Sequence, residues 1–152
     1  MRIGRRAFLA FVAGAALFVL TPVDAADPLP TGRRLALRGY DPVAYFTEAL
    51  PQKGIEEIWY AFDDAVYLFK SAEHRAKFMA EPERYAPQYD GYCAAGVSKG
   101  YKVEPDPEAW AILNDRLFVF QFKERVPMFK QDTGFIEKAN ANWPDLKGAP
   151  AR

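Results

Sequence analysis

The sequence contains a single cysteine, Cys93, and a single histidine, His74, among 152 residues. One cysteine excludes a disulfide within the chain and a paired-cysteine zinc site. The sequence also lacks an HExxH motif and a glycine-rich phosphate-binding loop. Basic and acidic residues balance at 20 each, so the net charge indicates neither nucleic acid nor an anionic membrane as a partner. Stability must come from packing, for which 12 Phe, 8 Tyr and 3 Trp supply large apolar side chains.

Residues 1–25 have the layout of an export signal. A start with three arginines precedes residues 7–20, which are uncharged and mostly apolar, and a small-residue cleavage site ends at Ala25. The apolar run is too short to span a bilayer. The pair Arg5-Arg6 resembles a twin-arginine signal, and an ordinary secretory signal that carries two arginines is the alternative. We therefore expect a periplasmic protein with no integral membrane segment in its mature chain.

Three segments are expected after the signal. Residues 26–34 are rich in proline and polar side chains, which is typical of a flexible lead. Residues 35–147 are long enough to form one domain with a core of its own. Residues 148–152 are expected to be a disordered tail.

The pattern within the domain predicts two antiparallel hairpins. Residues 58–69 surround Asp63-Asp64, and residues 110–122 surround Asn114-Asp115, a good two-residue turn. The order of a hairpin followed by a helix occurs twice, but no residue-level match indicates a duplication. We expect the α+β class, as a single small domain with helices packed on two hairpins.

Three helical segments are expected beside these hairpins. Ser71 caps a helix that runs to about Ala80 and stops before a proline. Asp90 caps a shorter helix that ends at Gly96. Residues 124–142 are helical in character, with a break near residue 133, and end before Pro144.

The two unique side chains, Cys93 and His74, are the main candidates for a functional site. Each is expected in the first turn of a helix, where backbone amides favour a thiolate and a neutral imidazole, the forms that bind metals. The structural alternatives are a small buried side chain for Cys93 and a half-buried histidine bonded to backbone for His74. Asp41 is a third candidate ligand, or else the cap of a short helix that Pro42 opens.

Three blocks resemble the YHS domain: Asp41-Pro42-Val43, residues 67–78 and residues 82–85. The chain is more closely similar to exported bacterial YHS-domain proteins that carry a GYDPVAYF block and a GYCAxGVSxG block. The resemblance runs from Gly39 to Pro144. It implies a compact α+β module and a capacity to bind transition metals.

The chain departs from the cysteine-bearing members of that family, which typically read DPVCG and FCSxxC. Ala44, Lys70 and His74 stand at the three cysteine positions. A closed four-ligand zinc site is therefore not expected, and an open or shared site with two or three ligands remains.

Three functions follow from these residues. The first is an exported YHS-domain protein that binds a transition metal, copper above all, through Cys93 and His74, with Asp41 as a further ligand. The second is a non-catalytic accessory module that holds a small molecule or a partner protein in an aromatic cleft. The third is a thiol enzyme with Cys93 as nucleophile and His74 as base. Whether Cys93 and His74 are adjacent in the fold separates these functions.

Overall fold

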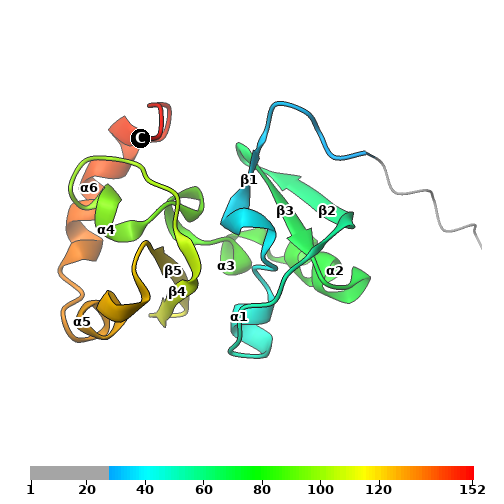
Figure 1. Cartoon of the computed structure of the whole chain (residues 1–152), viewed down its shortest axis with the longest axis horizontal. Helices are drawn as coiled ribbons and strands as arrows, with labels where there is room; N and C mark the ends of the chain where they lie inside the picture. The colour runs from blue at the N-terminus through cyan, green and yellow to red at the C-terminus, as the bar shows by residue number, and fades with distance from the viewer. Residues whose placement is uncertain (1–27) are drawn as a thin grey trace, which may run out of the picture.

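Two β-hairpins, each with helices packed on it, make up residues 28–152, the part of the chain that the computed structural model describes (Figure 1). The α+β class expected from the sequence is confirmed. Among the described residues, no helix is long and apolar enough to cross a membrane. The expected signal, residues 1–25, lies outside the described residues, so export stays a prediction. A reporter fusion in which Arg5 and Arg6 are both lysine should lose export if the twin-arginine assignment is right.

The first half of the molecule is built on a three-stranded sheet in the order β1-β3-β2, with β1 parallel to β3 and β2 antiparallel to it. Its elements are β1 (Arg34–Leu35), the 3-10 turn η1 (Ala36–Gly39), α1 (Ala44–Thr47), β2 (Ile55–Phe62), β3 (Ala65–Phe69), α2 (Ala72–Ala80) and α3 (Pro82–Tyr85).

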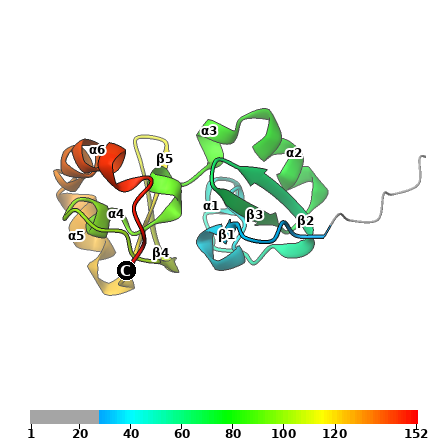
Figure 2. The same ribbon diagram turned by 90° about the horizontal axis from the view of Figure 1, so that it is seen from above.

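The second half is built on the antiparallel pair β4-β5. Its elements are the 3-10 turn η2 (Gln88–Gly91), α4 (Ala94–Val97), β4 (Asp106–Leu113), β5 (Arg116–Phe120), the 3-10 turn η3 (Lys123–Arg125), α5 (Val126–Gln131) and α6 (Phe135–Leu146). Figures 1 and 2 show the two halves side by side, each with its own hairpin and helices.

The two hairpins have the same residue pairing, shifted by 51 positions. Ile55 pairs with Phe69 in the first hairpin, and Asp106 pairs with Phe120 in the second. The register shift that follows Ile55 and ends at Trp59 recurs between Asp106 and Trp110. An identical register with an identical irregularity shows that one structural unit occurs twice in this chain. The sequence pattern does not reveal this repeat, but the strand pairing aligns the two hairpins residue by residue.

The turns that precede the hairpins repeat as well. In η1, two residues with left-handed backbone angles are followed by Gly39 at φ 83°, and in η2 two such residues are followed by Gly91 at φ 75°. Glycine suits both positions because residues with a side chain rarely adopt these backbone angles. Each glycine is followed by a tyrosine, Tyr40 or Tyr92, whose amide donates to a carbonyl three residues earlier at 3.0 and 2.9 Å.

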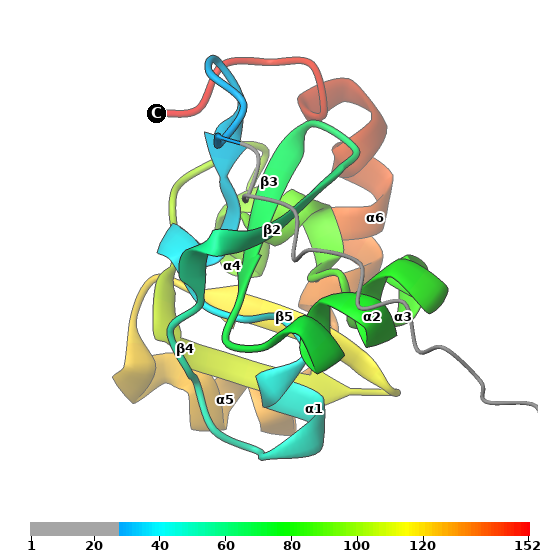
Figure 3. The ribbon, with the colours of Figure 1, turned by 90° about the vertical axis from the view of Figure 1, so that its right-hand side faces the viewer.

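A core shared by both halves joins them. Leu37 and Tyr45 from the first half pack with Leu117 and Val119 from the second, and all four are fully buried. The Tyr45 hydroxyl donates to the carbonyl of Pro107 at 2.8 Å. Figure 3 shows the two hairpins crossing one another, one in front of the other. The apolar contacts and the buried hydrogen bond hold the halves in one fixed arrangement.

The helix that begins after Ser71 is confirmed, because the Ser71 side chain accepts a hydrogen bond from the amide of His74 at 3.2 Å and α2 ends at Ala80. The cap expected at Asp90 is wrong. Asp90 lies in η2 with φ 53°, and α4 begins only at Ala94, because the left-handed turn cannot continue into a helix.

The helical segment near the C-terminus passes the expected stop at Pro144, which lies inside α6. Trp143 packs on the rings of Tyr89 and Tyr92, with centroids 5.7 and 6.4 Å away, so tertiary contacts hold the last turn in place despite the proline. The tail returns to the body of the molecule, where the amide of Arg152 donates to the carbonyl of Lys102 at 3.0 Å.

Candidate functional site

A buried carboxylate holds the only histidine. Asp41 is fully buried, and its Oδ2 lies 2.7 Å from Nδ1 of His74, which is itself buried. The same oxygen accepts the amide of Lys70 at 2.9 Å, while Oδ1 accepts the amides of Val43 and Ala44 at 2.8 and 3.4 Å. Asp41 thus accepts two amides at the start of α1, although the N-cap residue of that helix is Val43 rather than Asp41. The carboxylate also fixes the orientation of the His74 ring.

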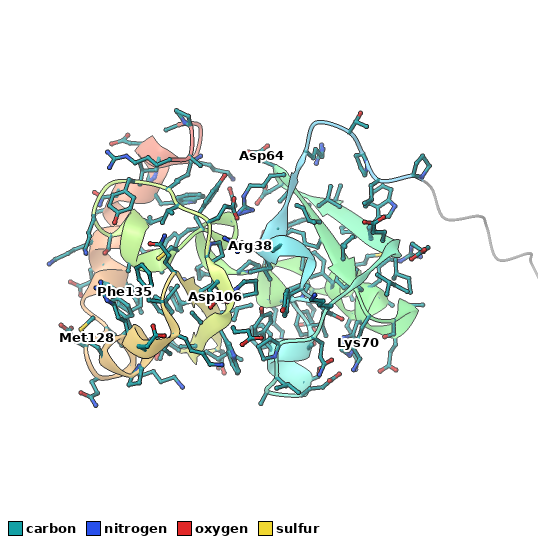
Figure 4. The ribbon with its side chains drawn as sticks, in the orientation of Figure 1. Arg38, Asp64, Lys70, Asp106, Met128 and Phe135 are labelled. Atoms are coloured by element: carbon teal, nitrogen blue, oxygen red, sulfur yellow. The ribbon has the colours of Figure 1, made fainter. Side chains whose placement is uncertain are left out.

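The second ring nitrogen of His74 faces a surface ion pair. Nε2 lies 3.7 Å from Oε1 of Glu48, and this carboxylate also pairs with the ammonium group of Lys70. Glu48 and Lys70 are both exposed at the edge of the first half, where Figure 4 labels Lys70. His74 thus has one nitrogen fixed internally and one close to solvent.

Cys93 lies in the other half of the molecule. It directly precedes α4, whereas His74 is on α2, and Figures 1 and 2 both show these helices on opposite sides. The structure brings Asp41 to His74 but does not bring Cys93 to either. Within residues 28–152, no group of three or more His, Cys, Asp or Glu side chains is arranged to hold a metal ion. Neither a shared metal site nor a Cys93–His74 catalytic pair forms in this chain.

Cys93 instead lines a cavity of about 140 Å³ between α4, the end of β5 and α5. Cys93 as a whole residue is 4% exposed. Phe120 and Phe129 form a stacked pair beside it, with ring centroids 4.5 Å apart. The full lining is Cys93, Ala95, Gly96, Ser98, Lys99, Tyr101, Phe120, Gln121, Phe122, Arg125, Met128 and Phe129. Aromatic and sulfur-containing side chains make this a site for an apolar group.

The mouth of this cavity exposes both apolar and cationic side chains. Met128 and Phe122 are 54% and 48% exposed and lie together at this mouth. Figure 4 shows Met128 on the outer side of α5. Lys99 and Arg125 are also exposed, and the Arg125 guanidinium lies over the Phe122 ring at 5.2 Å. No acidic residue is among the residues that line the cavity.

A second cavity, of about 190 Å³, lies where the two halves meet and is mostly polar. Tyr67, Tyr89, Asp90 and Lys147 are among its lining residues. Burial raises the pKa of Asp90 above its usual value and raises that of Tyr89 to about 12. The Tyr89 hydroxyl donates to Asn140 at 2.9 Å, so this side chain already has a partner within the protein. These groups fit a structural contact between the halves.

The sequence pattern singled out Cys93 but missed the residues that reach the cavity from η3 and α5. Arg125, Met128 and Phe129 come from a segment expected only to be helical. The signal that could have found them is the 51-residue repeat, since Phe120 and Phe129 stand where the first half has Phe69 and Phe78.

Three comparisons with known proteins found no relative of this chain. No protein-family model matches the chain, and neither curated proteins nor solved structures give a match. Membership of the YHS family therefore stays a prediction that rests on the sequence blocks alone.

Proposed function

We propose that this chain is an exported, non-catalytic binding module that holds a small molecule with an apolar body in the cavity beside Cys93. The observation that carries the proposal is the cavity itself. Three phenylalanine side chains and one tyrosine side chain line it. Its volume is close to the ~150 Å³ at which engineered apolar cavities bind benzene. An apolar lining with a few polar groups at its mouth is the usual form of a small-molecule site.

Toluene is a suitable first probe because it is neutral and close to this volume. Binding should appear as chemical-shift changes confined to the amides of α4, β5 and α5. Ala95 lines the cavity, so Ala95→Phe should fill it and abolish binding. Ala76→Phe, an equal change on the exposed face of α2, is the control and should bind as wild type does. Equal toluene affinity in both variants would reject the cavity as the site.

A transition metal bound by His74 is the second candidate function. It is supported by the hydrogen bond from Nδ1 to Asp41, because a histidine ligand commonly gives its other nitrogen to a carboxylate. Nε2 and Glu48 would supply two protein ligands, and a partner or water would complete the shell. Lys70 opposes this arrangement because its ammonium group already pairs with Glu48.

Copper titration of wild type and of His74→Gln tests this second function. The substitution should lower the affinity at least about tenfold if His74 is a ligand. Unchanged affinity would remove His74 from the site. Cys93→Ser is the matched control, because Cys93 lies in the other half and should not affect an ion at His74.

A further inference from the structure

The cavity beside Cys93 occupies the place that the Asp41–His74 pair fills in the first half. Asp41 and Cys93 each follow a Gly-Tyr pair, and their amides donate to equivalent carbonyls, at 2.8 Å to Gln52 and at 3.0 Å to Val103. Cys93 therefore stands at the repeat position of Asp41. The second half therefore has a thiol where the first half has the carboxylate that contacts the histidine.

Arg125 stands at the repeat position of His74. Each lies five residues after the last residue of its hairpin, Phe69 or Phe120. Four residues further on, Phe78 packs on Phe69 with ring centroids 5.3 Å apart, and Phe129 packs on Phe120 at 4.5 Å. These ring contacts keep the two segments in register beyond the hairpins. A nitrogen-bearing side chain thus stands at both positions, but only His74 has a carboxylate partner.

The second half consequently has an unmatched cation where the first has an internal contact between a carboxylate and a histidine. Throughout residues 28–152, neither Arg125 nor Lys99 forms an ion pair, although both line the cavity. A guanidinium is suited to bind a planar carboxylate through two parallel hydrogen bonds. The aromatic lining would hold the apolar part of the same molecule.

From this repeat we infer that the cavity binds a small aromatic or branched aliphatic carboxylate. Its acidic group takes the place of the missing Asp41 carboxylate and pairs with Arg125, with Lys99 adding positive charge at the mouth. The volume of about 140 Å³ limits the apolar body to roughly one benzene ring. This inference rests on the proposed binding function and adds the chemical class of the ligand.

Benzoate and benzamide separate the contribution of charge from that of shape, because they differ only in the acidic group. We expect wild type to bind benzoate roughly 10- to 100-fold more tightly than benzamide, as a charge-assisted pair requires. Arg125→Gln should lower benzoate affinity far more than benzamide affinity and so bring this ratio close to one. Arg75→Gln removes an exposed arginine from α2 in the other half and should keep the wild-type ratio.

Cys93→Asp adds a complementary test. It restores the carboxylate of the first half, so Arg125 should acquire an internal partner and benzoate binding should be lost. If this variant does not fold, the Arg125→Gln comparison still decides. If wild type binds toluene but prefers benzoate no more than benzamide, the carboxylate inference is overturned and the proposed function stands. If neither toluene nor benzoate binds, both are overturned.

Discussion

Replacing Phe78 with alanine should lower the free energy of unfolding by about 3–5 kcal/mol. Phe78 is fully buried, with an exposed fraction of 0%. Its ring contacts four aromatic side chains at centroid distances between 4.9 and 6.2 Å: Tyr60, Phe62, Tyr67 and Phe69. Removing it leaves a void that these rigid rings fill poorly. Urea unfolding followed by fluorescence measures the loss.

The repeat supplies a matched control for this substitution. Phe129 occupies the equivalent position in the second half, but it is only partly buried and borders the cavity. Phe129→Ala should therefore cost clearly less than Phe78→Ala, because a partly buried ring loses less buried apolar area when it is truncated. A cost of Phe78→Ala under about 1.5 kcal/mol, or below that of Phe129→Ala, would show that the core around Phe78 is not more tightly packed than the region around Phe129.

The elements that the sequence predicts correctly are those with a local chemical cause. Ser71 caps α2 through its own side chain. Asn114 and Asp115 both have positive φ, 51° and 58°, as a tight two-residue hairpin turn requires. Signals of this kind act over two to four residues, so they can be interpreted without knowledge of the rest of the fold.

The prediction for Asp90 fails because a local signal meets a non-local constraint. Aspartate is a good helix cap. Asp90, however, lies in the left-handed turn that ends at Gly91, and this turn is the counterpart of η1 in the repeat. Pro144 fails as a stop for a similar reason, since Trp143 is anchored on Tyr89 and Tyr92 from another element.

The candidate site shows the same division. The hydrogen bonds of Asp41 at the start of α1 reach only two and three residues ahead, and the sequence indicates them. The contact with His74 spans 33 positions and depends on how α2 returns to the start of the domain. Cys93 and His74 are each unique in the chain, but uniqueness carries no information on distance. Nor do they stand at equivalent positions of the repeat: His74 contacts Asp41 in the first half, whereas Cys93 stands at the repeat position of Asp41 and borders the cavity of the second half.

Asp41→Asn should lower the free energy of unfolding by about 3–5 kcal/mol, the range for removing one partner from a buried contact that involves a charged group. Both carboxylate oxygens of Asp41 accept hydrogen bonds, Oδ1 from two backbone amides and Oδ2 from the amide of Lys70 and from His74. An asparagine side chain has one acceptor oxygen and one donor NH₂ group. One set of donors must therefore face another donor in a fully buried position.

A substitution of the same chemistry at the surface separates this effect from a general one. Asp106 is only half-buried and accepts the amide of Glu108 at 2.9 Å in an exposed hydrogen bond, so Asp106→Asn should cost under about 1 kcal/mol. The contribution of His74 follows from a double-mutant cycle with His74→Leu, in which Asp41→Asn should cost measurably less than in wild type because the ring contact is already gone. An Asp41→Asn loss no larger than that of Asp106→Asn would show that this carboxylate does not hold the start of the domain together. Additive costs in the cycle would show that the amides of Val43, Ala44 and Lys70, rather than His74, account for its role.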